Sequence, residues 1–202
     1  MKKKLLMGIG ISFVLLAIFL FHGRDIQNTE KIIYYLKDLD SYSCNVNIQI
    51  ENEKQQINYG GRQYYDSRYG ERFELGKDRV IVYRGNKIFV KNSDNSGKYS
   101  MEKNFNSLFK FCFIEEYISL LYTNEKIDNS FKKVNNEQYQ VVRLDIPGNN
   151  KNISKAELYV NLKHNTPTYL KIFDSTGRKK VDVEYSDFKA NVELSENIFD
   201  IN

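Results

Sequence analysis

The sequence is poor in the residues from which most catalytic and metal sites are built. Its 202 residues include no Trp, two Pro, two Cys and two His. The histidines, His22 and His164, lie far apart, so no local nucleophile–base pair or transition-metal motif can be formed with them. Glu115 and Glu116 are adjacent, and adjacent positions of a helix do not share a face. We therefore expect a protein that is not an enzyme, with no catalytic residue, no cofactor and no metal site.

Neither acidic nor basic residues are clustered along most of the chain. The 30 Lys and Arg against 26 Asp and Glu give a net charge of +4. Basic residues are interleaved with acidic ones instead of forming a stripe that could follow phosphates. Nucleic acid is therefore not expected as a partner. The aromatic residues are 15 Tyr and 13 Phe, a composition that favours strands.

Long apolar runs are absent except at the amino terminus. Three lysines at positions 2–4 precede an apolar run from Leu5 to Phe21, which is near the lower length limit for a bilayer span. Only Arg24, offset by Asp25, follows closely, so the lysines should stay in the cytoplasm. The sequence predicts a signal-anchor transmembrane segment over residues 1–23 and an exported domain over residues 24–202. Residues 5–21 would hold the chain in the membrane with its carboxy-terminal domain on the extracytoplasmic side.

Two other export signals fit the sequence less well. A cleavable signal peptide needs small residues before the cut, and residues 17–23 offer a poor site. A lipoprotein needs a cysteine directly after the apolar run, whereas the first cysteine is Cys44. Cys44 and Cys112 both lie among apolar positions, which favours buried free thiols, with a disulfide between them as the alternative.

Hydrophobic periodicity predicts the elements of the exported domain. Apolar residues recur with helical spacing over residues 28–40 and then alternate with polar ones from Tyr42 to Ile50, as in a half-buried strand. Further strands are predicted at 56–65 (with a bend or bulge at Gly60–Gly61), 69–75, 79–83, 87–91, 138–146, 156–162, 168–173 and 179–185, and a largely buried helix at 108–122. The predicted fold class is α+β: a strongly curved antiparallel sheet, or half-barrel, with helices covering its concave face.

Two segments of the exported domain resemble known proteins. Residues 157–177, a strand, a turn with Pro167 and a strand ending in a polar-glycine turn, together with residues 197–201, resemble the LolA/LolB lipoprotein-carrier superfamily. Residues 61–66 and 79–91 resemble the central meander of the GerS-type spore germination proteins within it. GerS itself carries a lipid-attachment cysteine, which is missing here.

This resemblance implies a LolA-like fold and a non-catalytic role in sporulation or germination. The implied partner is a spore-cortex cell-wall amidase, and the implied location is the cytoplasmic or forespore membrane. The alternative is a carrier that binds a lipid or the acyl chain of a lipoprotein in the concave sheet, and an enzyme whose site lacks a recognisable motif ranks third. Homo-oligomerisation also stays open.

Aromatic side chains of the meander form the candidate partner or ligand surface. Such side chains supply a large contact area at low entropic cost. Cross-strand packing within the sheet is the competing explanation, and the one we favour. The candidate residues are Tyr64, Tyr65, Tyr69, Phe73, Tyr83 and Phe89.

Overall fold

The computed structural model describes residues 31–52, 54–77, 79–92, 97–102, 107–123 and 127–201. The expected membrane segment, residues 1–23, lies outside these ranges. None of the helices within them has the length and apolar character that a membrane span requires. The chain divides into two compact units, residues 1–36 and 37–202. The described part of the first unit, residues 31–36, is helical, as the sequence pattern predicts.

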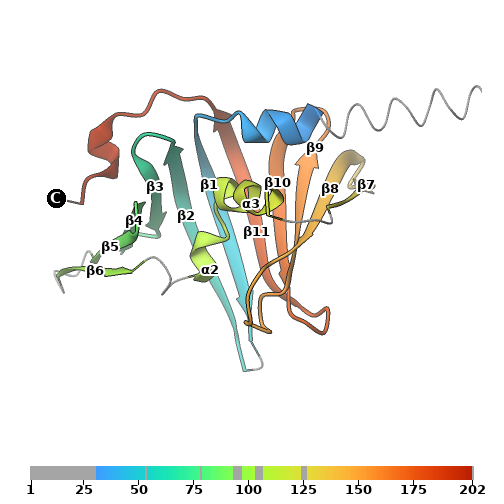
Figure 1. The fold of residues 1–202 in the computed structure, drawn as a ribbon, viewed down its shortest axis with the longest axis horizontal. Coiled ribbons are helices and arrows are strands. Elements are labelled where there is room, and N and C mark those ends of the chain that lie inside the picture. The colour runs from blue at the N-terminus through green and yellow to red at the C-terminus, as the bar shows by residue number, and fades with distance from the viewer. Residues whose placement is uncertain are drawn as a thin grey trace, which may run out of the picture. The chain divides into compact units, whose positions relative to one another are not determined.

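One antiparallel sheet forms the framework of the second unit (Figure 1). Eleven strands lie within the described residues, in the order β6-β5-β4-β3-β2-β1-β11-β10-β9-β8-β7. The central pair, β1 and β11, thus joins strands from opposite ends of the sequence. The strands are β1 (Ser41–Glu51), β2 (Gln56–Asp66), β3 (Gly70–Leu75), β4 (Arg79–Arg84), β5 (Lys87–Asn92), β6 (Lys98–Glu102), β7 (Asp128–Val134), β8 (Glu137–Asp145), β9 (Lys155–Asn161), β10 (Thr166–Phe173) and β11 (Lys179–Ala190).

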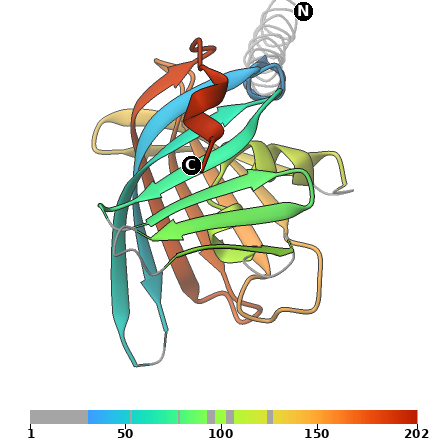
Figure 2. The same ribbon diagram turned by 90° about the vertical axis from the view of Figure 1, so that its left-hand side faces the viewer.

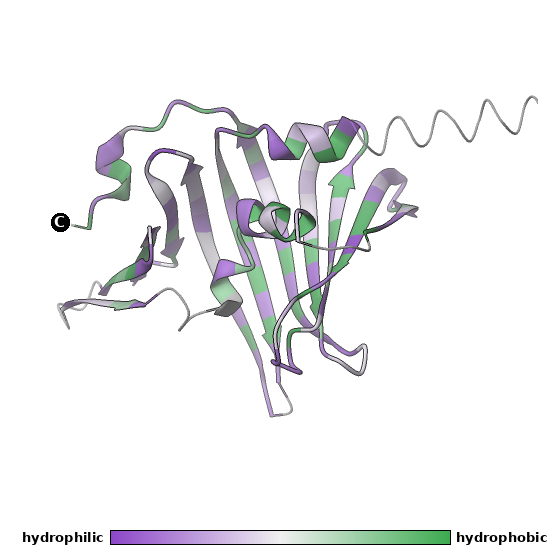
Figure 3. Ribbon diagram, viewed as in Figure 1, coloured by the Kyte–Doolittle hydropathy of each residue, from purple (hydrophilic) through white to green (hydrophobic). Residues whose placement is uncertain are grey.

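The sheet is curved, and two helices, α2 (Ser107–Lys110) and α3 (Ile114–Leu121), lie against its concave face (Figure 1). Alternate strand residues point toward them, because successive side chains of a strand face opposite ways. In the centre, Ile48 of β1 and Val183 of β11 are paired and both fully buried. Figure 3 shows hydrophobic residues alternating along the strands and recurring on α3. The predicted curved antiparallel sheet with helices on its concave face is confirmed for this unit.

The helical segment differs from the single helix predicted over residues 108–122. It breaks between α2 and α3, where Phe111 to Phe113 form a turn. The broken backbone is hydrogen-bonded by the sheet: the Cys112 carbonyl accepts from Gln63 Nε2 at 3.2 Å and from Tyr185 Oη at 2.8 Å. These donors are remote in the sequence, so a local apolar pattern cannot reveal the break. The expectation of one continuous helix was wrong for this reason.

Two strands and the expected bulge at Gly60–Gly61 also differ from expectation. β6 and β7 were not predicted, because most of their side chains are exposed and their apolar residues do not alternate regularly. The pairing of β1 with β2 has no register shift at Gly60 and Gly61, so of the predicted bend or bulge the bulge is absent there, and the bend stays a prediction. Gly61 instead allows close packing, since a Cβ at this position would lie 2.2 Å from the Glu74 carbonyl oxygen.

The outer face of the sheet is partly covered by the carboxy-terminal segment. The short 3₁₀ helix η2 (Glu196–Phe199) lies over β3 (Figure 2). Arg72 Nη1 donates to the Ile198 carbonyl at 2.7 Å, and the Phe199 ring packs 5.8 Å from that of Tyr69. The carboxy-terminal segment thus covers β3 through a bond from the Arg72 side chain and covers the β2–β3 turn through the Phe199 ring.

Candidate functional site

The six predicted aromatic residues do not form one surface. Phe73 and Tyr83 are 0% and 1% exposed, and both rings pack edge-on against Phe113, at 6.2 and 5.6 Å between centroids. They belong to the core on the concave side. Tyr65 also lies on this side, 5.4 Å from the Tyr42 ring.

The other three aromatic residues lie elsewhere. Tyr64 alternates with Tyr65 along β2 and so lies on the outer face, where Arg62 stacks on its ring at 5.1 Å. Phe89 pairs with Val82 on the outer face, and Tyr69 lies at the turn beneath η2. The structure therefore brings Tyr65 and Tyr83 together with the helical segment, and separates them from Tyr64 and Phe89.

Side chains of the helical segment fill the middle of the concavity. Tyr117 is 1% exposed and its Oη donates to the Val142 carbonyl at 2.6 Å. The first backbone N–H of α3, on Ile114, donates to Tyr42 Oη at 3.0 Å. The N-cap residue, Phe113, makes no side-chain hydrogen bond to this end of α3. The strand side chain of Tyr42 therefore satisfies a backbone donor that the helix itself leaves unpaired.

Both cysteines are free thiols in the core, as favoured from the sequence. Burial raises the pKa of the Cys112 thiol to about 12. The pKa of Cys44 is raised further for the same reason, with a smaller opposing effect of Arg62. Because the thiolate is the reactive form, neither thiol is suited to act as a nucleophile at neutral pH.

A second aromatic cluster, which the sequence analysis did not identify, lies on the outer face of β8, β9 and β10. The rings of Tyr139, Tyr159 and Tyr169 are 5.9–6.3 Å apart between centroids. Lys132 and Lys171 lie 5.4 and 4.9 Å from the Tyr159 ring centroid, within reach of cation–π interaction. The alternation of side chains along each strand puts these tyrosines on one face. Contact between them depends also on the order of the strands in the sheet.

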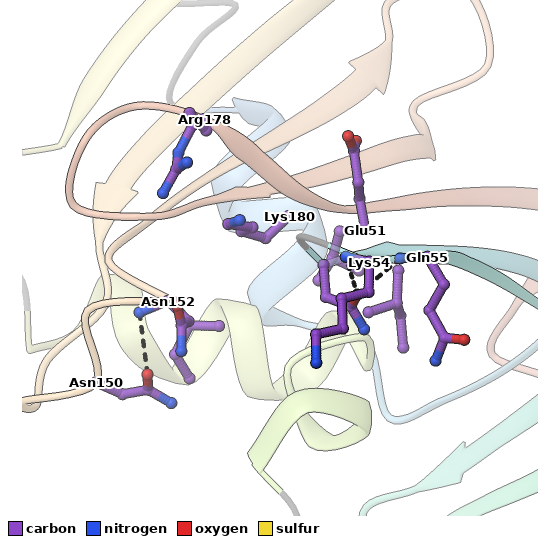
Figure 4. A pocket seen from close by; sticks show the side chains of 11 residues that line it. Glu51, Lys54, Gln55, Asn150, Asn152, Arg178 and Lys180 are labelled. Carbon is purple, nitrogen blue, oxygen red and sulfur yellow. Dashed lines mark hydrogen bonds between the residues drawn. The ribbon is translucent and has the colours of Figure 1, made fainter.

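A pocket of about 690 Å³ opens where three chain reversals meet, and we call it the hairpin pocket (Figure 4). It lies between the β1–β2 hairpin, the β8–β9 loop and the start of β11. Ile50, Ile153 and Val181 give it an apolar floor. Its polar rim is formed by Glu51, Asn52, Lys54, Gln55, Asn150, Asn152, Arg178 and Lys180. This composition suits a ligand with an apolar part and a polar or anionic end.

The basic residues of the rim are partly neutralised by Glu51 in the lining and by one buried carboxylate beside it. Asp174, whose side chain is 4% exposed, lies 2.9 Å from Arg178 Nε and 3.8 Å from Lys180 Nζ. A hydrogen bond from Thr176 Oγ1, backbone N–H groups and the Arg178 guanidinium hold the pKa of Asp174 well below its usual range. Across the pocket, on the β1–β2 hairpin, the Lys54 side chain points away from Glu51 (Figure 4).

Groups of three or more Asp, Glu, His or Cys side chains that could hold a metal ion do not occur within the described residues. The two sheet edges, β6 and β7, have no further described strand beside them. Such edges can pair with a strand of another chain. The geometry thus offers a filled concavity with a pocket at one end, and two edges for protein contact.

Comparison with known proteins gives the chain a family. The model for YdcC-like sporulation proteins matches residues 2–199. No curated protein sequence matches the chain significantly. An uncharacterized conserved protein from Thermus thermophilus is 11% identical with a TM-score of 0.54, covering 87% of this chain and 92% of that one.

Two further solved structures belong to the groups that the sequence resembles. The complex of the CwlD amidase with the GerS lipoprotein from Clostridioides difficile contains a chain 26% identical to this one, with a TM-score of 0.44, covering 82% of this chain and 92% of that chain. A LolA superfamily protein from Nitrosomonas europaea is 13% identical, with a TM-score of 0.42, covering 85% of this chain and 97% of that one. Since the family model spans nearly all of the sequence, the chain belongs to the YdcC-like family of sporulation proteins.

Proposed function

We propose that this protein is a membrane-anchored, non-catalytic component of the spore envelope that binds and regulates a spore-cortex cell-wall amidase. Family membership supports a role in sporulation. The GerS-like residues of the meander, 61–66 and 79–91, support an amidase as the partner. The observation that favours a protein partner over a lipid cargo is that the helical segment fills the concave face of the sheet.

A lipid carrier needs an open apolar cavity in the sheet, and here the protein's own helical segment fills the centre of it. Phe113, Ile114 and Tyr117 are each at most 1% exposed. Emptying this space would remove their burial, which stabilises the fold by about 1.5–3 kcal/mol for each large apolar side chain. The arrangement therefore favours contacts made by the outside of the domain.

Anchoring would make even a weak contact effective. If residues 5–21 remain in the membrane, the domain and a membrane-associated amidase share a thin layer at the surface. Confinement raises the effective concentration of one partner around the other without any new contact. The amidase would then act where the anchor holds the complex.

Deletion of the gene in its spore-forming host tests this function. We expect spores with altered cortex modification and poor germination, and we expect the anchored chain to restore both. Muropeptide analysis of purified cortex measures the effect. Unaltered cortex peptidoglycan in the deletion strain would contradict the proposal.

A second candidate function, lipid or lipoprotein carriage, is favoured by the hairpin pocket. Its apolar floor and cationic rim would suit an acyl chain with an anionic head group. Native mass spectrometry of the protein purified from membranes tests this candidate. A stoichiometric lipid, lost when Val181 is replaced by Lys, would support it, and an unloaded protein would exclude it.

A further inference from the structure

A second pocket, of about 420 Å³, lies at the opposite end of β2 from the hairpin pocket, and we call it the acidic pocket. Its volume is within the roughly 300–1,000 Å³ of typical ligand sites. The β2–β3 turn, the β4–β5 turn and the helical segment line it. The lining residues are Tyr65, Asp66, Ser67, Gly70, Glu71, Tyr83, Gly85, Lys110, Glu115, Glu116 and Ser119.

The described lining is dominated by negative charge. It contains four carboxylates, and Lys110 is the one basic residue among the lining residues. Lys110 Nζ lies 2.7 Å from Glu116, and Arg68, from outside the lining, lies 2.8 Å from Asp66. The other two carboxylates of the lining are Glu71 of β3 and Glu115 of α3. Such a pocket attracts a cation and repels an anion.

One buried polar atom points to a ligand independently of the charge. Tyr83 is 1% exposed, and its hydroxyl has no hydrogen-bond partner within the described part of the chain. Buried hydroxyls are nearly always paired, since an unmade bond costs about 1–3 kcal/mol. Tyr83 lines the acidic pocket, so a donor bound there could satisfy its oxygen.

The environment of the two phenols agrees with this electrostatic description. Burial, followed by the charge of Glu71, raises the pKa of Tyr83. Burial, followed by the charges of Glu115 and Glu71, raises the pKa of Tyr65 as well. Both rings stay neutral at physiological pH, and neutral aromatic faces bind cations favourably.

We propose that the acidic pocket receives a Lys or Arg side chain of the protein partner. A guanidinium or ammonium group supplies the donors that Tyr83 Oη can accept, matches the carboxylates, and has an alkyl stem that packs against Tyr65. This inference rests on the proposed function, because it specifies how the amidase would be held.

The pocket can be tested without the amidase. Propylguanidinium is titrated into the isotope-labelled full-length protein in detergent micelles, and amide shifts are followed by NMR. We expect saturable shifts centred on Tyr65 and Tyr83 that weaken with salt. Glu115→Gln should raise the Kd about two- to fivefold, in line with a partly exposed ion pair. The matched control Glu102→Gln, on the exposed strand β6, should bind as wild type.

Co-purification with the amidase separates failure of the pocket from failure of the proposed function. Reduced capture by Glu115→Gln and Tyr83→Phe, with full capture by Glu102→Gln, supports the pocket as the docking site. Equal capture by all four proteins overturns the pocket and leaves the function standing. Absence of capture by the wild type overturns the function, and the titration then decides on the pocket alone. Non-saturable shifts, or shifts that Glu115→Gln leaves unchanged, would refute the acidic pocket as a cation-binding site.

Discussion

The hydrogen bond between the sheet and the start of α3 provides a quantitative test of how the concave face is filled. Tyr42 and Tyr117 are both 1% exposed, and the hydroxyl of each is hydrogen-bonded between sheet and helix. Tyr42→Phe removes the acceptor of the Ile114 N–H, a buried donor that an intrahelical bond cannot satisfy. We expect a loss of about 1–3 kcal/mol of unfolding free energy, the cost of an unsatisfied buried group.

Tyr117→Phe makes the same chemical change with a smaller expected effect. Its partner, the Val142 carbonyl, lies on β8 inside the ladder between β7 and β9, so a backbone partner remains. We expect a loss of about 0.5–1.5 kcal/mol, the net value of one hydrogen bond. Tyr99→Phe, at a ring 46% exposed on β6, serves as the control with no measurable loss.

Urea denaturation monitored by circular dichroism measures the three variants. With a slope of about 2 kcal/mol per molar urea, Tyr42→Phe should lower the midpoint by about 0.5–1.5 M. A midpoint for Tyr42→Phe equal to that of Tyr99→Phe would show that Tyr42 Oη does not stabilise the start of α3. A larger loss for Tyr117→Phe than for Tyr42→Phe would contradict the expected order of the two losses.

The core, the pocket rim and the anchor each give a further prediction. Phe113→Ala should lower the unfolding free energy by about 3–5 kcal/mol, because a fully buried ring leaves a cavity, and a loss under about 1 kcal/mol in urea denaturation would contradict this. Asp174→Asn should lower the melting temperature at pH 7. Since the folded-state pKa of Asp174 is lowered, that difference should shrink as the pH falls from about 4, and a difference independent of pH would argue against it. Mass spectrometry of the mature protein should find residues 5–21 still attached, whereas an amino terminus near Arg24 or an acyl group would reject the anchor.

The strands of the meander could be predicted because their apolar residues alternate on a half-buried sheet. β1 and β3 to β5 lie within a residue or two of the expected ranges. β6 and β7 lack this signal, since most of their side chains are exposed and no buried face requires apolar residues to alternate. Positive φ angles at Asn135 and Asn136 mark the turn between β7 and β8. That Asn-Asn pair was the available local signal for the missed hairpin.

The candidate surface was less predictable than the fold, because it depends on contacts distant in the sequence. Alternation alone could have separated Tyr64 from Tyr65. The burial of Phe73 and Tyr83 could not be read from β3 and β4, because Phe113 of the helical segment covers them. The acidic pocket combines Glu71 with Glu115 only because α3 lies across the concave face.

The most direct test of the proposed function is purification of the tagged, full-length protein from membranes of sporulating cells under mild detergent. We predict that a spore-cortex amidase co-purifies in near-stoichiometric amount and that the domain carries no tightly bound lipid. A protein recovered without the amidase, but with one lipid molecule per chain, would contradict the account and favour carriage.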